Sequence, residues 1–558
     1  MSAASRLPWP VKYAITLIAG CAHASGVTWP FDRIFTLGQP LWWLQILSLT
    51  VLVWQLDQAQ TKREAAWLGL LFATAMQLAT WWWLFISLHT YGGLAAPLSV
   101  IAIVGLAAFL ALYYAAACAL FMALAPVNLA GRATVFAAVW LLAELLRVAL
   151  FTGFPWGQGG YAQLDGPFVE LAKLIGVHGL TFGAALLAAA VAGLSSIRAA
   201  GQTGRRRWLA SGMVATGVLA AVVGSAALRI NAAGTSLFSQ AAPTAASPGL
   251  PAPAFTVTLL QGNIAQDEKF KPTGGLPDAL NWYGQQLLAA TATLVITPET
   301  ALPVLPEQLP DGYLEALSQR FTQPSFGLAS TAALIGIPLG NSSAGYTNSV
   351  IALKPPTPAE PGVYQYDKHH LVPFGEFVHP LFKWFLAIVN IPLSDFNRGD
   401  VKQPPFAWQG QRIAPNICYE DLFGEELAAR FSDPLIAPTM MVNVSNIGWF
   451  GNTVAIDQHL NISRMRAIEF ERPMIRATNT GATAVIDHTG RVTHSLERHT
   501  RGVLTAPVEG RTGNTPYANW AARYGLWPWW LLIIAIISGA ACARINWATG
   551  RFKSQKSP

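Results

Sequence analysis

The sequence predicts an integral membrane protein that combines a bundle of eight transmembrane helices with an extramembrane α/β domain. Apolar stretches of membrane-spanning length fill most of the first 230 residues, and short β-branched runs replace them from about residue 255. Only 12% of the 558 residues are charged, about half the roughly 25% of soluble domains, and the mean hydropathy is +0.37. This composition argues against a fully soluble or disordered protein.

We predict each transmembrane helix from the length of its apolar stretch, since about 20 apolar residues in a helix cross a hydrocarbon core of about 30 Å. Seven such stretches form a predicted bundle over 1–230, and an eighth lies near the C-terminus, before a tail at 546–558. The eight predicted spans are 11–27, 40–56, 66–88, 96–124, 132–151, 168–197, 208–230 and 526–545.

The composition changes twice between the seventh and the eighth span. Residues 231–254 are rich in Ala, Pro and Ser and carry no charge, which is typical of a linker. From 255 to 515, runs such as ATLVITPET and MMVNVSN alternate with helical stretches such as 311–321 and 455–472. This alternation predicts an α/β domain that is long enough to bury its own core.

The distribution of Lys and Arg predicts the orientation in the membrane, because short cytoplasmic loops retain positive charge. With eight spans, the loops and tails of one side hold 13 basic residues, and the opposite short loops hold only Arg33. Both termini are therefore predicted to be cytoplasmic, with the α/β domain on the far side. The net charge of +7 reflects this bias, since residues 231–526 contain 19 basic and 23 acidic residues, and it gives no reason to expect nucleic acid.

One of the four cysteines, Cys418, lies in the α/β domain, at the end of the strand-like run RIAPNICYE. The other three fall inside predicted spans, where a thiol packs as a small apolar group, and four scattered cysteines predict no disulfide framework. Taken alone, Cys418 is either a buried structural residue or a nucleophile.

Two further reactive side chains stand at comparable places. Glu299 closes ATLVITPET before a turn, at the kind of strand end where open α/β sheets place their sites, and Lys368 lies in YDKHHLVPFGE. Glu299 could take the thiol proton, a Cys418 thiolate could attack a carbonyl carbon, and Lys368 could stabilise the oxyanion. Individually, Glu299 could be a helix N-terminal charge and Lys368 a surface cation, and spacing does not show that they meet.

This Glu–Lys–Cys order resembles the nitrilase, or carbon–nitrogen hydrolase, superfamily, and the surrounding motifs resemble the bacterial apolipoprotein N-acyltransferases. The similar motifs are TPETALP, YDKHHLVPFGEF, ICYE, NIGWFG, and HL followed by RMRAIEFERP and RATNTG. That family also has eight membrane helices with its catalytic domain inserted before the last, so the resemblance covers nearly the whole chain. It implies a nitrilase-like α-β-β-α sandwich.

Carried over position by position, the resemblance implies Glu299 as general base, Lys368 as oxyanion stabiliser and Cys418 as nucleophile. Three further residues match positions that support this triad, namely Glu376, Tyr419 and Glu420.

Aromatic residues are expected to contact the substrate, and two positions depart from the family pattern. The expected contacts are Phe270, Trp449 and Phe450. Phe270 stands where the family frequently has Trp, so it keeps an aromatic ring but loses the indole N–H. Ile447 stands where Asp is usual, which puts any polar role at that position in doubt without touching the triad.

The resemblance implies a ping-pong acyl transfer that completes lipoprotein maturation. The donor is a phospholipid, with phosphatidylethanolamine expected, whose sn-1 chain forms a thioester on Cys418. The acceptor is the α-amine of the diacylglyceryl-cysteine at a lipoprotein's N-terminus. No cofactor and no metal are expected. The implied location is the bacterial inner membrane, with the catalytic domain periplasmic, and a monomer is expected.

Two further features lie outside the triad. The segment 377–393 is too apolar for an ordinary exposed loop and too Pro-broken to span, and it is either a lid that dips into the membrane surface or a buried core helix. Its predicted membrane contacts are Phe382, Trp384 and Phe385. Within the membrane, Glu144 and Arg147 stand three apart on one helix, where they could pair or contact substrate.

Two alternative functions remain open at this point. A membrane-tethered amidase would use the same triad with water as the acceptor, and the sequence does not exclude water. A transporter with a solute-binding α/β domain would need broken helices with polar residues in matched halves, and the sequence contains no internal repeat and mostly apolar spans.

Overall fold

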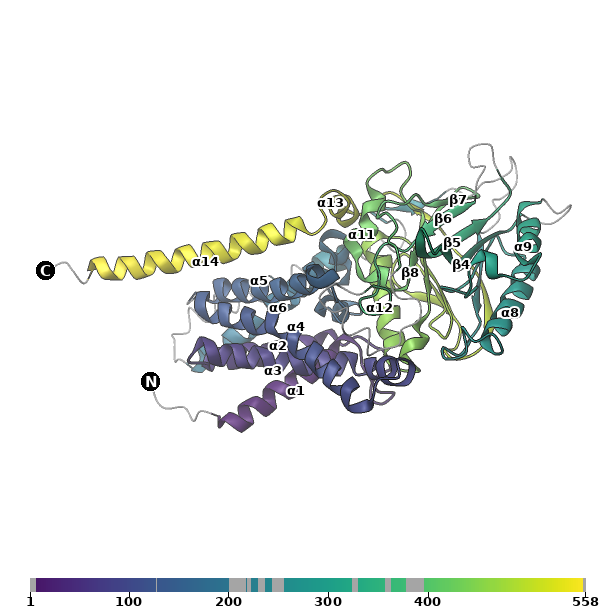
Figure 1. Ribbon diagram of the computed structural model, residues 1–558. Coiled ribbons are helices and arrows are strands. Elements are labelled where there is room, and N and C mark those ends of the chain that lie inside the picture. The colour runs from purple at the N-terminus through teal and green to yellow at the C-terminus, as the bar shows by residue number, and fades with distance from the viewer. Residues whose placement is uncertain are drawn as a thin grey trace. The chain divides into compact units, whose positions relative to one another are not determined.

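The computed structural model describes residues 7–126, 128–199, 217, 222–228, 236–242, 255–323, 330–356, 363–377 and 396–554. The chain divides into two compact units, and Figure 1 shows the helices of one and the layered sheets of the other. The helical unit contains Met1–Trp82, Pro97–Gly234 and Leu526–Pro558, and the sheet unit contains Trp83–Ala96 and Thr235–Gly525.

Long apolar helices build the helical unit, and they pack around a core that includes Phe72, Tyr114 and Trp140. The long helices are α1 (Trp9–Val27), α2 (Trp42–Gln58), α3 (Lys62–Trp81), α4 (Ala96–Leu124), α5 (Leu129–Ala149), α6 (Ala172–Ala199) and α14 (Trp527–Ser554). The short turns η2 (Leu150–Thr152), η3 (Gly159–Gln163) and η4 (Val169–Leu171) lie between α5 and α6. Among the described residues, four stretches are long and apolar enough to cross a membrane: Ala96–Leu124, Leu129–Thr152, Val169–Leu194 and Trp527–Asn546.

The predicted span 66–88 is wrong at its C-terminal end. Helix α3 stops at Trp81, and the π-helical turn η1 (Ile86–Tyr91) that follows belongs to the sheet unit. Apolar composition could not reveal this change, because the aromatic side chains after Trp81 are buried by protein surface as readily as by lipid. The predicted span 208–230 lies largely outside the described residues, and the prediction of eight spans stays a prediction.

Two six-stranded sheets form the centre of the sheet unit, with strand orders β13-β2-β3-β4-β5-β6 and β12-β11-β10-β9-β8-β7. The first contains β2 (Thr256–Gln261), β3 (Leu294–Ile296), β4 (Ala332–Asn341), β5 (Gly345–Leu353), β6 (Tyr364–Asp367) and β13 (Gly502–Pro507). The second contains β7 (Phe406–Trp408), β8 (Gln411–Ile417), β9 (Met440–Ser445), β10 (Met474–Thr478), β11 (Ala484–Ile486) and β12 (Val492–Ser495). Strands β1 (Gln240–Ala241) and β14 (Arg511–Thr512) form a separate pair.

Helices cover the outer face of each sheet, and a shared apolar core fills the space between the two sheets. Helices α8 (Gly275–Ala289) and α9 (Tyr313–Thr322) lie on the first sheet, and α11 (Gly424–Ala428), α12 (Ala455–Phe470) and α13 (Pro516–Tyr524) lie on the second (Figure 1). Strand β3 explains the layering: Leu294 and Ile296 enter the core between the sheets, while Val295 faces the helices. The four layers confirm the expected α-β-β-α sandwich.

The central strands of both sheets are parallel, which brings their carboxyl ends to common edges. Strands β2, β3 and β4 run parallel in the first sheet, and β8, β9 and β10 do so in the second. Short turns follow two of these strands, namely η7 (Cys418–Leu422) after β8 and η9 (Ile447–Phe450) after β9. Ligand sites of α/β sheets lie at such carboxyl edges.

Candidate active site

Glu299 lies just beyond the end of β3, in a tight turn, and its carboxylate is almost fully buried. One oxygen, Oε1, accepts hydrogen bonds from Asn348 Nδ2 at 2.7 Å and Lys368 Nζ at 3.1 Å. The other, Oε2, accepts from the backbone N–H of Asn446 at 2.9 Å. Elements from both sheets therefore orient this carboxylate.

Lys368 follows β6 and is fully buried between two carboxylates. Its Nζ lies 3.1 Å from Glu299 Oε1 and 2.8 Å from Glu376 Oε2. Asn348 Nδ2 donates to both carboxylates, reaching Glu376 Oε1 at 2.8 Å. Glu376 thus joins the network, and its support of the triad stays a prediction; Asn348 is a bridging residue that the sequence did not indicate.

Cys418 is the first residue after β8, and its backbone φ of 51° lies in the left-handed region. Its Sγ accepts a hydrogen bond from Ser445 Oγ at 3.3 Å, at the end of β9. Cys418 as a residue is partly exposed, and it stands at the same sheet edges as Glu299 and Lys368.

The charges at this edge act directly on one another. Burial and then the negative charge of Glu299 raise the pKa of Cys418 to about 12, against the opposing effect of Lys368. Burial alone would raise the pKa of Glu299, but Lys368, Asn348 and Lys269 outweigh it and hold the pKa below its usual range. Both pKa shifts favour a neutral thiol at Cys418 beside an ionised carboxylate at Glu299.

Lys269 is a second buried ammonium at this edge, and sequence reasoning did not assign it a role. Its Nζ donates to the Glu299 carbonyl at 3.1 Å and to Thr300 Oγ1 at 2.7 Å. Burial lowers its pKa to about 8, against the raising effects of Glu299 and Cys418. It directly precedes Phe270, one of the predicted substrate contacts, and that position was the one signal for it.

Glu420 holds together the loops that carry Lys368 and Cys418. Its carboxylate is buried and accepts hydrogen bonds from the backbone N–H of His369 at 2.7 Å and from Tyr366 Oη at 2.9 Å. It also accepts from the N–H of Ile417, immediately before the cysteine. This side chain has a structural role that couples β6 to β8. Tyr419 is buried and packs edge-on against Phe423.

The predicted aromatic contacts Trp449 and Phe450 are partly buried against residues from Trp83–Ala96. Phe450 packs on Trp83 with ring centroids 4.3 Å apart, and Trp449 meets Tyr91 edge-on at 5.8 Å. Ile447 is buried in the same turn. A substrate role for Trp449 and Phe450 stays a prediction.

Phe270 and the lid segment differ in what the structure describes. The Phe270 ring is partly buried beside Lys269, whose Nζ lies 5.9 Å from the ring centroid. The predicted lid residues Phe382, Trp384 and Phe385 lie outside the described residues.

Glu144 and Arg147 are both buried in the helical unit, yet they have different hydrogen-bond partners. Glu144 accepts from the backbone N–H of Gly159 at 2.9 Å and from Thr181 Oγ1 at 3.0 Å. Arg147 donates to Tyr114 Oη at 3.0 Å and to the Phe154 and Trp156 carbonyls. The two residues therefore brace the segment between α5 and α6, and the structure records no ion pair between these two described side chains.

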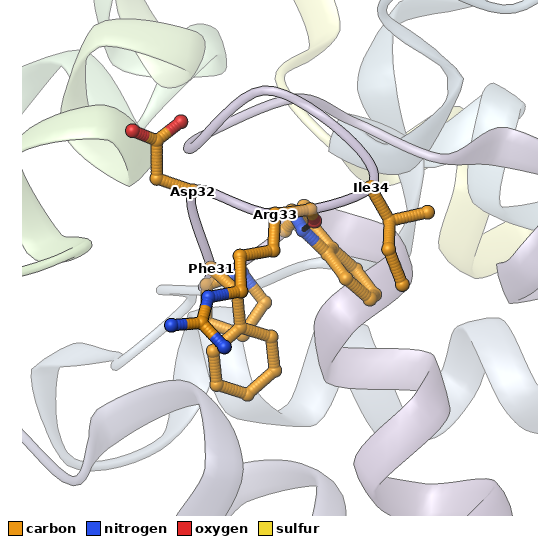
Figure 2. A pocket seen from close by; sticks show the side chains of 6 residues that line it. Phe31, Asp32, Arg33 and Ile34 are labelled. Atoms are coloured by element: carbon orange, nitrogen blue, oxygen red, sulfur yellow. Dashed lines mark hydrogen bonds between the residues drawn. The ribbon is translucent and has the colours of Figure 1, made fainter.

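A pocket of about 590 Å³ lies in the helical unit, where the chain connects α1 to α2. Figure 2 shows that Asp32 and Arg33 point in different directions from this loop. The lining residues are Trp29, Pro30, Phe31, Asp32, Arg33 and Ile34. This set contains no cysteine and none of the side chains around Cys418, so the pocket is not a candidate for the chemistry at Cys418.

Comparison with known proteins gives first the class and then the family. Residues 256–517 match the carbon-nitrogen hydrolase family, and residues 34–190 match the apolipoprotein N-acyltransferase N-terminal domain. The matches and the apolar helices define a membrane-associated enzyme with a carbon-nitrogen hydrolase domain.

Curated relatives cover nearly the whole chain. The apolipoprotein N-acyltransferase of Verminephrobacter eiseniae is 54% identical over 536 residues, covering 94% of each chain. That of Ralstonia nicotianae is 44% identical over 481 residues, covering 86% of each. That of Bordetella bronchiseptica is 40% identical over 579 residues, covering 96% of this chain and 98% of its own. The chain belongs to the apolipoprotein N-acyltransferase family and is an N-acyltransferase.

Proposed function

We propose that the enzyme moves the sn-1 acyl chain of a phospholipid to Cys418 and then to the α-amine of a lipoprotein's diacylglyceryl-cysteine. Phosphatidylethanolamine is the proposed donor. One observation carries the assignment of residues: the carboxylate, ammonium and thiol follow the ends of β3, β6 and β8 and act on one another electrostatically. The proposed active chain is a monomer, since this single chain supplies all three groups.

In the first step, Glu299 takes the thiol proton while Sγ attacks the ester carbonyl carbon. A thiol whose pKa is raised to about 12 needs such a base, because little thiolate exists at neutral pH. The Lys368 ammonium stabilises the oxyanion of the tetrahedral intermediate. The ester C–O bond then breaks, and the leaving alkoxide takes the proton from Glu299 and departs as lysophospholipid.

In the second step, the lipoprotein amine attacks the thioester carbon. A C–N bond forms, the C–S bond breaks, and Glu299 passes the amine proton to the departing thiolate. Glu376 holds Lys368 in place throughout, and it balances that positive charge when Glu299 is protonated. The same site serves both substrates in turn, which is the condition for ping-pong kinetics.

Membrane attachment suits this chemistry, because both substrates are lipids and exposing each CH₂ to water costs about 0.8 kcal/mol. We propose eight spans, with both termini cytoplasmic and the sheet unit periplasmic, in a bacterial inner membrane. The proposed divisions are the bundle at 1–230, the linker at 231–254, the catalytic domain at 255–515 and the last span at 526–545. Helices α1, α2 and α3 have 19, 17 and 20 residues, close to the length a bilayer demands. Protease added to spheroplasts should cut the sheet unit, and cleavage only in inside-out vesicles would reverse the orientation.

The mechanism is tested by intact-protein mass spectrometry after incubation with phosphatidylethanolamine in detergent micelles. The wild-type enzyme should gain one fatty-acyl mass that hydroxylamine removes and that a diacylglyceryl lipopeptide consumes. Cys418→Ala should gain none, while the control Cys542→Ala, which removes an exposed thiol elsewhere, should keep the adduct. Activity without any adduct would exclude the covalent mechanism, and release of free fatty acid in place of acyl-lipopeptide would favour the amidase.

A further inference from the structure

The backbone of Cys418 adopts a conformation that its own side chain does not favour. Its φ of 51° lies in the left-handed region, which residues other than glycine rarely enter. Such a conformation persists only where the surrounding structure enforces it. The residue directly follows β8 and opens the turn η7, so the direction of its thiol depends on how this one peptide unit is held.

Two buried side chains hold the carbonyl of Cys418. Asn443 Nδ2, from β9, donates to the oxygen at 3.0 Å, and His459 Nε2, from α12, lies 3.2 Å from it. Asn443 Nδ2 also donates to Asn416 Oδ1 at 2.6 Å, which uses its second hydrogen. Both lone pairs of the Cys418 carbonyl are thereby engaged, and the peptide plane is fixed from two elements.

The contacts of His459 define which ring nitrogen carries the hydrogen. Arg476 Nη2 lies 3.1 Å from His459 Nδ1, and a guanidinium only donates, so Nδ1 is the acceptor. The hydrogen therefore resides on Nε2, where it faces both the Cys418 carbonyl and Asp421 Oδ1 at 3.0 Å.

Asp421 and Arg476 fix the ring between them, and neither is exposed. Arg476 Nη1 reaches Asp421 Oδ2 at 3.3 Å, and Ser463 Oγ donates to the same oxygen. A fully buried carboxylate and guanidinium therefore converge on a single histidine, whose Nε2 hydrogen is shared between that carboxylate and the backbone carbonyl of the proposed nucleophile.

We propose that His459, oriented by Asp421 and Arg476, is a positioning residue that acts with Asn443 to hold the Cys418 backbone and so aim its thiol. His459 is not a general base for the thiol, because its Nε2 hydrogen is shared between the Cys418 carbonyl and Asp421 Oδ1, and the described Sγ contact is to Ser445. The proposal rests on the assignment of Cys418 as nucleophile.

The test is the single-turnover rate of acyl-enzyme formation by the full-length protein with phosphatidylethanolamine. His459→Leu removes the donor and should slow acylation about 10- to 100-fold, since a displacement of about 1 Å at a reacting atom costs as much. His459→Gln keeps an amide N–H at the position of Nε2 and should restore most of that rate, with KM for the lipid unchanged in both. Asn443→Leu should also slow acylation. The double variant with His459→Leu should slow it by less than the product of the two single effects, because both residues hold the same carbonyl.

The matched control is Thr515→Val, which removes a buried hydrogen bond from Oγ1 to the Glu469 carbonyl, of 2.6 Å, in the same unit. It should lower the melting temperature and leave acylation at the wild-type rate. The proposal would be overturned if folded His459→Leu acylated at the wild-type rate. It would also be overturned if the acylation rate followed the melting temperature across all variants, Thr515→Val included.

If His459→Leu does not fold, His459→Asn replaces it, because the Asn amide is one carbon shorter than that of Gln and does not reach the carbonyl. Equal rates for the Asn and Gln variants would then overturn the proposal. An adduct in Cys418→Ala would refute the nucleophile itself.

Discussion

Gly336 lies in the middle of β4, directly beside the turn that presents Glu299, and it leaves no space for a side chain. A Cβ at this position would lie 2.2 Å from the Pro298 carbonyl oxygen, 2.8 Å from Thr300 N and 3.0 Å from Glu299 Cα. Ordinary contact begins near 3.4 Å, so Gly336→Ala must push this turn by about 1 Å.

The displacement has two expected consequences. Overpacking of this kind costs about 1–3 kcal/mol of folding free energy, so the variant should fold with a lower melting temperature. A shift of about 1 Å in Glu299, the proposed general base, should lower the rate of acyl-enzyme formation about 100-fold. The turn is further tied to this position, because Gly336 N donates to Thr297 Oγ1 at 2.9 Å and Leu302 N donates to the Gly336 carbonyl.

The measurement combines the acylation rate from time-resolved intact-protein mass spectrometry with thermal unfolding. The control is Gly502→Ala in β13 of the same sheet, where the new Cβ meets only the Leu496 side chain, at 3.4 Å. It should acylate at the wild-type rate. A folded Gly336→Ala protein that acylates within about threefold of wild type would refute the reasoning, because the base would then tolerate the displacement.

Three further predictions concern the buried charges. Glu420→Gln turns an amide N–H₂ group toward backbone N–H groups that now donate to the carboxylate, so one of these donors loses its acceptor. We expect the free energy of unfolding to fall by about 1–3 kcal/mol and acylation to slow, and an unchanged melting temperature would contradict this. The pKa of Lys269 is lowered from 10.5 to about 8, so the unfolded chain binds more protons than the folded protein between these two pH values. The free energy of unfolding of the wild type should therefore rise with pH across that window, and that of Lys269→Met should not. Equal pH slopes in the melting series of the two proteins would contradict this. The Cys418 thiolate, followed by its ultraviolet absorbance, should form at lower pH in Glu299→Gln, because this variant lacks the negative charge that raises the thiol pKa. It should form at higher pH in Lys368→Met, which lacks the positive charge that lowers that pKa. The reverse order would show that these two charges do not act on Cys418 as described.

Much of the fold could be predicted from the local pattern of the chain. The stretches 311–321 and 455–472 correspond to α9 and α12, and the β-branched runs from ATLVITPET to MMVNVSN correspond to strands. These predictions succeed because apolar periodicity and strand propensity are local properties. The boundary at 66–88 failed because the same apolar residues suit a lipid-facing helix and a surface packed on Phe450 equally well.

The sequence by itself indicated the kinds of groups in the candidate site and their placement at strand ends, which the structure gives as Glu299 after β3, Lys368 after β6 and Cys418 after β8. Only the tertiary structure decided what orients them. Asn348 reaches the Glu299 carboxylate across 49 residues of sequence, and the N–H of Asn446 does so across 147. These contacts depend on strand register and on how two sheets face each other, and such long-range geometry leaves no local pattern in the chain.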